Sequence, residues 1–331
     1  MKPRFLYFYA TITIWAALAC GQSPTWRQLL PANNPPARVY AASAYDTATR
    51  LFTVFGGNGP GQGASFSDTW VWNGRDWTQM QPAANPGPRY AAAMAYDGHS
   101  GQAVLFGGTF LNASAPFGDT WVWDGTNWTE MHPAVSPSAR FGAAMAYDSH
   151  SGRIFMFGGY TGPSPNEGGV FLNDTWAWSG TNWVQLTTAL SPSARDFATM
   201  AGTESGELIL FGGALNVFAA DDTWVWNSKT TAWTQLQPAN SPSPRFGVVL
   251  VRDSTLKQVV LFGGSLDFVN TFYGDTWLWD GTNWTQQTPA NSPSARGFTV
   301  STYDAKNKGV VMFGGAACCN GNIFADTWVY K

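Results

Sequence analysis

Short runs of apolar residues, separated by turn residues, recur along the whole chain. In one unit, residues 90–96 are small and apolar, which is typical of a strand buried on both faces. Residues 103–106 form a second apolar run that ends in a Gly-Gly pair. Residues 120–123 alternate as a third strand, an Asp-Gly pair then signals a tight turn, and Trp128 opens a fourth strand. The pattern predicts four short antiparallel strands per unit and no helix.

This unit is repeated, with three markers that keep their order. Phe-Gly-Gly begins at Phe55, Phe106, Phe157, Phe211, Phe262 and Phe313, at steps of 51, 51, 54, 51 and 51 residues. Asp-Thr-Trp begins at Asp68, Asp119, Asp174, Asp222, Asp275 and Asp326. An arginine opens each unit, at Arg38, Arg89, Arg140, Arg195, Arg245 and Arg296. A unit of about 50 residues with four strands is one propeller blade, and blades bury their faces only by stacking in a ring.

The closure of the ring is also predicted. The sixth unit stops at residues 328–331 and lacks a fourth strand. Residues 26–31, Trp-Arg-Gln-Leu-Leu-Pro, match the fourth strand of an internal unit at residues 233–238, Trp-Thr-Gln-Leu-Gln-Pro. We therefore expect the N-terminal segment to supply the outermost strand of the last blade, which removes an open edge.

The order of these markers resembles that of the kelch-repeat family: an arginine, an apolar strand, Gly-Gly, an Asp before an aromatic residue, and a spaced Trp. The resemblance covers residues 24–331 and is similar in style to the central propeller of galactose oxidase and to exported bacterial kelch proteins. It implies an all-β fold, a six-bladed kelch-type β-propeller. Kelch domains mostly bind proteins or glycans, and one bacterial branch interconverts sialic acid anomers, so the resemblance specifies fold more strongly than function.

The resemblance does not carry a copper site over. Galactose oxidase holds copper with two tyrosines and two histidines, one tyrosine being crosslinked to a cysteine. No cysteine of this chain stands where a blade could present that set. We expect no metal, no cofactor and no galactose oxidase activity.

The N-terminal segment differs from the repeats. Lys2 and Arg4 precede an uncharged apolar run at residues 6–19, whose last three residues, Ala-Leu-Ala, fit a cleavage site. The run is short for a membrane span, which needs roughly 20 residues. We interpret residues 1–19 as a signal peptide.

Cys20 follows the cleavage site directly, in a loose match to a bacterial lipobox. A lipid-anchored chain and a freely exported chain both stay open, which makes the protein periplasmic, outer-membrane-anchored or secreted. Residues 20–25 are then a short linker, and residues 26–331 are the propeller.

The charge of the chain limits its partners. Without Lys2 and Arg4 it keeps 16 basic against 21 acidic residues, and no basic patch is visible in the sequence. Nucleic acid is therefore not an expected partner. We expect a monomer that contacts a membrane only through a lipid anchor.

The units differ most in the loops between Gly-Gly and Asp-Thr-Trp, all of which should emerge on one face. They are residues 58–67, 109–118, 160–173, 214–221, 265–274 and 316–325. They are rich in Gly, Asn, Ser and aromatic residues, which suits a glycan or protein ligand. The candidate ligand-binding residues are Glu167, Asn112, Asn216, Asp267, Asn270 and Asn320. We interpret the chain as a recognition module that binds through this face, without catalysis.

An enzyme of the sialic acid mutarotase kind is the alternative. Asp196 follows Arg195, where other units have an apolar or aromatic residue or Gly, and Arg252 replaces the usual strand-one Tyr. An acid beside a ring of arginines in the axial pocket could act in acid–base chemistry. The plainer interpretation is a paired structural charge.

The remaining conspicuous residues have structural explanations. The six arginines and six aspartates lie at the same end of each blade, so we expect them to pair. Four aromatic residues two positions before the Asp are interpreted as packing: Phe66, Phe117, Tyr273 and Phe324. For the adjacent Cys318 and Cys319, a strained disulfide and two free thiols both stay open.

Overall fold

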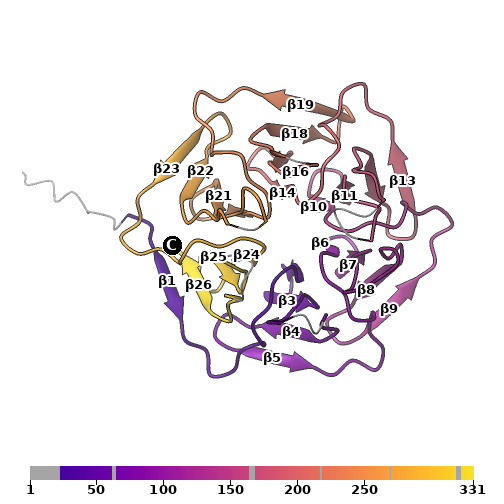
Figure 1. Cartoon of the computed structure of the whole chain (residues 1–331), viewed down its shortest axis with the longest axis horizontal. Helices are drawn as coiled ribbons and strands as arrows, with labels where there is room; N and C mark the ends of the chain where they lie inside the picture. The colour runs from indigo at the N-terminus through magenta and orange to yellow at the C-terminus, as the bar shows by residue number, and fades with distance from the viewer. Residues whose placement is uncertain (1–22, 62–64, 164–167, 217, 269, 318–321) are drawn as a thin grey trace, which may run out of the picture.

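The structure is a computed structural model that describes residues 23–61, 65–163, 168–216, 218–268, 270–317 and 322–331. Six four-stranded antiparallel sheets stand around a central axis, and none of the described residues is helical (Figure 1). The structure confirms the predicted all-β, six-bladed propeller.

In each blade the strands follow one another from the axis to the rim. Blade one contains β2 (Ala42–Asp46), β3 (Leu51–Phe55), β4 (Thr69–Trp72) and β5 (Trp77–Met80). Blade two contains β6 (Ala93–Asp97), β7 (Gln102–Phe106), β8 (Thr120–Trp123) and β9 (Trp128–Met131). Blade three contains β10 (Ala144–Asp148), β11 (Arg153–Phe157), β12 (Thr175–Trp178) and β13 (Trp183–Leu186).

The second half of the ring repeats this order with one addition. Blade four contains β14 (Thr199–Gly202), β15 (Leu208–Phe211), β18 (Thr223–Asn227) and β19 (Ala232–Leu236). Its variable loop forms a small hairpin of β16 (Ala214–Leu215) and β17 (Phe218–Ala219). Blade five contains β20 (Val249–Asp253), β21 (Gln258–Phe262), β22 (Thr276–Trp279) and β23 (Trp284–Gln287). Blade six contains β24 (Val300–Asp304), β25 (Gly309–Phe313), β26 (Thr327–Tyr330) and β1 (Trp26–Leu29).

The ring closes as the sequence predicts. β1 pairs antiparallel with β26, with Trp26 opposite Tyr330 and Gln28 opposite Trp328. Trp26 is fully buried, and its indole N–H donates a 2.9 Å hydrogen bond to the Thr276 hydroxyl of blade five. Both ends of the described chain therefore belong to one sheet (Figure 1).

The same indole-to-hydroxyl bond joins every pair of neighbouring blades. The Trp that opens each fourth strand donates to the Thr of Asp-Thr-Trp in the blade before it, at 2.9–3.1 Å. The bonds are Trp26–Thr276, Trp77–Thr327, Trp128–Thr69, Trp183–Thr120, Trp233–Thr175 and Trp284–Thr223. Because buried Trp N–H groups need an acceptor, these bonds fix the register of blade against blade.

The arginines and aspartates pair within each blade, and we call each pair a clamp. The clamps are Arg38–Asp68, Arg89–Asp119, Arg140–Asp174, Arg195–Asp222, Arg245–Asp275 and Arg296–Asp326, at 2.5–2.7 Å. Each is bidentate, and the Arg also donates to the carbonyl oxygen of the first Gly of Gly-Gly, at 2.9–3.2 Å. This arrangement confirms the expected structural pairing.

The aromatic residues before the Asp complete four of the clamps. The guanidinium carbon of the clamp Arg lies 3.7–4.6 Å from the ring centres of Phe66, Phe117, Tyr273 and Phe324. Such cation–π contacts stabilise a desolvated guanidinium. These residues therefore serve packing, as predicted.

The Gly-Gly pairs are needed because the chain turns tightly beside the next blade. Gly107 has φ +68°, and a Cβ there would lie 2.3 Å from the carbonyl oxygen of Arg140. A side chain at this position would force two blades apart. Glycine at this position thus lets the next blade pack closely, while the Gly107 carbonyl oxygen accepts a hydrogen bond from its own clamp residue, Arg89.

Candidate functional site

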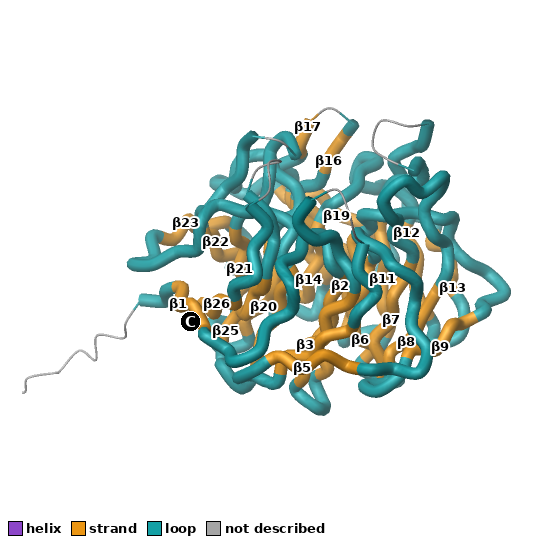
Figure 2. Tube along the Cα trace, turned by 60° about the horizontal axis from the view of Figure 1, so that its bottom comes forward, coloured by secondary structure: helices purple, strands orange, loops and turns teal. Residues whose placement is uncertain are grey.

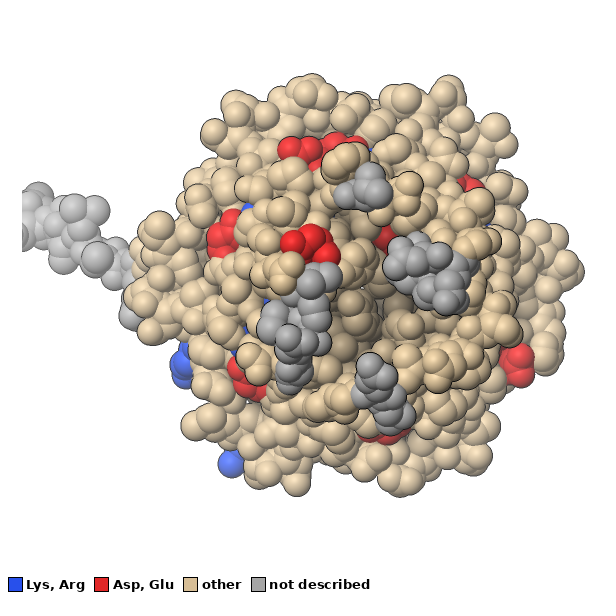
Figure 3. Space-filling model, viewed as in Figure 1, with Lys and Arg blue, Asp and Glu red and all other residues tan. Residues whose placement is uncertain are grey.

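The six variable loops emerge together on one side of the ring, which we call the loop face. Figure 2 shows these loops, with β16 and β17, above the body of strands. Figure 3 views this face directly and shows a hollow at its centre. The candidate site is therefore built on the residues that form the bottom and the rim of this hollow.

A closed ring of backbone hydrogen bonds surrounds the axis at this end. Its members stand two residues after each clamp Arg and all have positive φ: Tyr40, Ala91, Gly142, Phe197, Gly247 and Phe298. Each N–H donates to the carbonyl oxygen of the member from the preceding blade, at 2.7–3.3 Å. Strand one therefore begins after this turn, at Ala93 in blade two rather than at the expected residue 90.

Three of these members are aromatic, and their side chains meet over the axis. The ring centres of Tyr40 and Phe298 are 4.3 Å apart, and Phe197 lies 5.6 and 5.3 Å from them. Phe268, from the loop of blade five, stacks on Phe298 at 5.9 Å and contacts Phe246 at 4.1 Å. These five residues form what we call the aromatic floor of the hollow.

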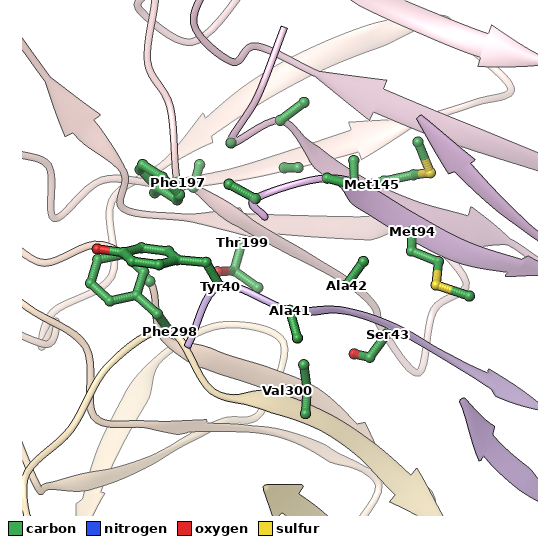
Figure 4. Close-up of a pocket in the computed structure, with 18 of the residues that line it drawn as sticks. Tyr40, Ala41, Ala42, Ser43, Met94, Met145, Phe197, Thr199, Phe298 and Val300 are labelled. Carbon is green, nitrogen blue, oxygen red and sulfur yellow. The ribbon is translucent and has the colours of Figure 1, made fainter. Parts of the chain in front are cut away.

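Beneath the floor lies an axial pocket of about 230 Å³, lined by the first residues of the inner strands. Figure 4 shows Tyr40, Phe197 and Phe298 gathered at one end of it, with Ser43, Met94 and Met145 further along. Its lining consists of Ala, Gly, Ser, Thr, Met, Val, Leu and aromatic residues, without an Asp, Glu, His, Lys or Arg among them. The polar groups that it offers are hydroxyls and the backbone of the inner strand edges.

The three residues of the enzyme alternative do not come together. Arg195 is held in its clamp by Asp222, and neither Arg195 nor Asp196 lines the axial pocket. Arg252 forms an ion pair with Glu204 at the hairpin end of the inner strands, opposite the loop face. The expectation of an acid beside arginines in the pocket is therefore not met by their positions.

Arg252 belongs to a set of contacts that join blades at that hairpin end. In blade six the corresponding residue, Tyr303, places its hydroxyl 2.8 Å from the Thr255 hydroxyl of blade five. Arg252 does the same for blades five and four by pairing with Glu204. The replacement of the usual strand-one Tyr by Arg252 therefore changes the contact between these two blades from a hydroxyl contact to an ion pair.

Asp196 lies beside the aromatic floor and is 1% exposed. Its backbone forms a two-bond bridge with Ala214, but neither of its carboxyl oxygens has a hydrogen-bond partner among the described residues. Burial raises the pKa of Asp196 to about 8. The other blades place Val39, Tyr90, Phe141, Phe246 and Gly297 at this position. Blade four therefore buries a neutral carboxylic acid where its neighbours bury apolar groups or none.

The predicted ligand-binding residues lie at the tips of the loops rather than in one cluster. Asn112 and Asn216 are exposed and have φ of 62° and 54°. The Asp267 carboxylate accepts bonds from the backbone N–H groups of Asn270 and Thr271, at 2.9 and 3.0 Å, and so orders its own loop. Glu167, Asn320, Cys318, Cys319 and Cys20 lie outside the described residues.

Sequence reasoning missed the apolar side chains on the rim of the hollow. We call the following exposed residues the apolar crown: Phe110 (40% exposed), Leu111 (41%), Val170 (61%), Phe218 (72%) and Leu266 (37%). They come from the variable loops of blades two to five. The sequence did contain an indication, because these large apolar residues stand in loop segments without the alternation of a strand. The prediction of ligand-binding residues instead used the polar residues beside them.

Charge on the loop face is sparse and acidic. The six variable loops contain Glu167, Asp221 and Asp267 and no Lys or Arg. Figure 3 shows acidic side chains around the hollow and basic ones mainly toward the edge of the view. The described residues hold no group of three or more His, Cys, Asp or Glu arranged to bind a metal. Within the same residues, no helix has the length and hydropathy to cross a membrane.

Known proteins resemble this chain in repeat and in fold. It is 28% identical to Kelch domain-containing protein 2 of Bos taurus over 45% of this chain, and 28% identical to Kelch domain-containing protein 1 of Homo sapiens over 42%. It is 26% identical to the dynein alpha chain of the flagellar outer arm of Chlamydomonas reinhardtii over 80% of its own length. These matches cover only 35%, 33% and 6% of the three relatives, so they concern the repeats and not the whole proteins.

The solved structure of YjhT superimposes with a TM-score of 0.67 at 16% identity, covering 90% of this chain and 96% of that one. At this identity the likeness concerns the fold. No protein-family model matches the chain. Repeat, blade count and structural likeness thus agree, while the ligand has to be argued from the loop face.

Proposed function

We propose, from the premise that this chain is a kelch-repeat β-propeller, that it is a recognition module whose loop face binds a glycan or a protein. One observation carries the proposal: six dissimilar loops surround a hollow with an aromatic floor, on a framework whose charges are used in clamps. Concave, largely apolar sites with a few polar groups are typical of ligand binding. The repeated parts of each blade hold the ring, and its variable part faces solvent.

Binding to glycan arrays and affinity capture from envelope extract test this function with the full chain. The informative variant is Asn112→Gly with Asn216→Gly, which removes two side chains from the loop tips while glycine keeps their positive φ. The control is Thr231→Gly with Lys308→Gly, two positive-φ positions in hairpins on the opposite side. We expect the first pair to weaken binding and the control to leave it unchanged. A folded chain that binds neither glycan nor protein contradicts the proposal.

We also propose that the chain is exported as a monomer, released or lipid-anchored at Cys20. The support is the charge and hydropathy pattern of residues 1–20. Cell fractionation with intact-mass analysis of the N-terminus, and light scattering of the purified protein, test it. An unprocessed chain that stays in the cytoplasm contradicts export.

Sugar-anomer exchange remains the alternative function, with Asp196 as the acid. The observation that favours it is the unpartnered carboxyl group of Asp196 beside the floor. NMR measurement of anomer exchange, with and without Asp196→Asn, separates the two functions. Exchange that the chain accelerates and the substitution abolishes would favour the enzyme.

A further inference from the structure

The apolar crown covers one sector of the loop face rather than its whole circumference. Its five residues are 37–72% exposed and lie in four successive loops, from blade two to blade five. In the loops of blades one and six, the large apolar side chains that the structure describes, Phe66, Ile323 and Phe324, are half-buried. A partner seated on the crown would therefore lie off the propeller axis.

In blade five, the crown and the floor of the hollow are supplied by the same loop. Leu266 is two residues from Phe268, whose ring lies 4.1 Å from Phe246 and 5.9 Å from Phe298. On the blade two side, Phe110 stacks on Phe117 at 5.7 Å. In blades two and five, exposed crown residues therefore stand in loops that also pack aromatic side chains. Large exposed apolar patches of this kind mark sites of macromolecular contact.

The charges among these apolar residues have one sign. In the loops of blades four and five, Asp221 and Asp267 are exposed and lie within three positions of Phe218 and Leu266. No variable loop contains a Lys or Arg to offset them. An anionic partner, such as nucleic acid or an acidic glycan, would be repelled, whereas a cationic partner gains a charge attraction beyond the hydroxyl hydrogen bonds that a neutral glycan offers.

We infer that the crown docks a protein segment whose exposed Leu, Ile or aromatic side chains are flanked by Lys or Arg. The apolar side chains of the segment cover the crown and exclude water, and its cations face the carboxylates of Asp221 and Asp267 in blades four and five. Interfaces commonly combine an apolar centre with a charged rim. The inference rests on the proposed function, since it names the class of ligand that the loop face recognises.

Selection of phage-displayed random 12-residue peptides on the immobilised full chain tests the inference. We expect the selected sequences to combine large apolar residues with Lys or Arg. Synthetic copies are then measured by fluorescence anisotropy against Phe218→Ser with Leu266→Ser, which should weaken binding at least tenfold. The matched control is Val184→Ser with Leu190→Ser, two residues that are 44% and 54% exposed outside the variable loops, and it should leave binding unchanged.

Charge is tested separately by Asp221→Asn, which should weaken peptide binding two- to fivefold and reduce its dependence on salt. Neutral or acidic selected peptides, or equal binding by the crown variant and its control, overturn the inference. A glycan that binds while no peptide does, with loss in the crown variant, overturns it and leaves the proposed function standing. Absence of every ligand overturns both.

Discussion

Blade four contains a half-buried carboxyl group in a clamp, Asp222, and a fully buried one beside the aromatic floor, Asp196, and their surroundings are opposite. Burial alone would raise the pKa of Asp222, but the hydrogen bonds and charge of Arg195 and the Trp224 indole outweigh it and lower that pKa. Asp196 has burial without a partner, and its pKa rises to about 8. One acid is thus charged and satisfied, and the other is neutral and unsatisfied.

The two acids differ because the clamp is repeated in every blade and the position of Asp196 is not. The clamp keeps the same chemistry in six blades, because each depends on an Arg that is at most 2% exposed. The position beside the floor holds a different kind of residue from blade to blade, including Val39, Asp196 and Gly297. Positions that hold the ring together are uniform, and the buried position after the clamp Arg varies.

The largest expected effect comes from removing β1, the strand that closes the ring. Deletion of residues 24–31 removes buried Trp26, its bond to Thr276 and the whole ladder to β26. Truncation of one large buried aromatic residue costs about 3–5 kcal/mol, against a total stability of about 5–15 kcal/mol. We expect aggregation or a much lower melting temperature, followed by circular dichroism. The replacement Gln28→Ala, in the exposed part of the same strand, serves as control. An unchanged melting temperature would show that the ring closes by other contacts.

Breaking one clamp should have the next largest effect. Asp174→Asn leaves the Arg140 guanidinium, 1% exposed, without its countercharge. Loss of one partner from a buried ion pair costs about 3–5 kcal/mol. Urea unfolding measures the loss, and Glu130→Gln, which removes an exposed acid from β9, should cost little. Equal stability of the two variants would mean that the clamps are dispensable.

Low pH should also weaken the clamps and so lower the stability of the fold. Burial alone would raise the pKa of Asp174, but the hydrogen bonds and charge of Arg140 lower it below the usual value. An Asp with a depressed folded-state pKa contributes stability above its unfolded pKa of about 4, and the contribution is lost as pH falls through the folded value. The Asp174→Asn variant should therefore lose less stability than the natural chain when the pH is lowered.

Asp196 should show the opposite pH dependence. Its folded-state pKa is about 8, whereas an unfolded Asp releases its proton near pH 4. The folded state thus binds more protons between these values, so stability decreases as pH rises through this window, by up to about 1.4 kcal/mol per pH unit. Asp196→Asn should remove this slope, as measured by urea unfolding from pH 4 to 9. A variant with an unaltered slope would mean that the carboxyl group is solvated.

The smallest effect on stability is expected at the crown. Phe218→Ser with Leu266→Ser should change the free energy of unfolding by no more than about 1 kcal/mol, because Phe218 is 72% exposed and Leu266 is 37% exposed. Thermal unfolding beside the natural chain is the measurement. A loss of 2 kcal/mol or more would place these residues in the core and remove the contrast between framework and loop face.

The framework could be predicted from the sequence because each of its contacts uses a repeated residue type. Arg38 and Asp68 are marked by their recurrence, and Trp26 by its match to an internal strand. The ring of positive-φ residues could not be foreseen, because Tyr40, Phe197 and Phe298 are residue types that also suit the strand they precede. Their φ is set by backbone bonds between blades, which no local pattern records.

The candidate site was predicted only in its location. The loop face followed from the variation among units, and Asp196 stood out as an acid at an apolar position. Whether Asp196 would find a partner depended on neighbours from other blades, and Arg252 paired with Glu204 instead of facing the axis. The apolar crown was not predicted, because the exposure of a side chain depends on the folded loop and not on the residue type.

The pairing of β1 with β26 also governs when the propeller can finish folding. The first strand of the ring pairs with a strand about 300 residues later in the chain, since Trp26 has Tyr330 as its partner. Contacts between segments so far apart in the sequence form slowly, because the chain must close a long loop before they are gained. A ring in which β26 has not yet folded is thus an open arc with one unfinished blade, and Trp26 lacks its strand partner until β26 is in place. Completion of the ring is then a single late event, and its rate sets how long the apolar edge of that arc is exposed to other chains.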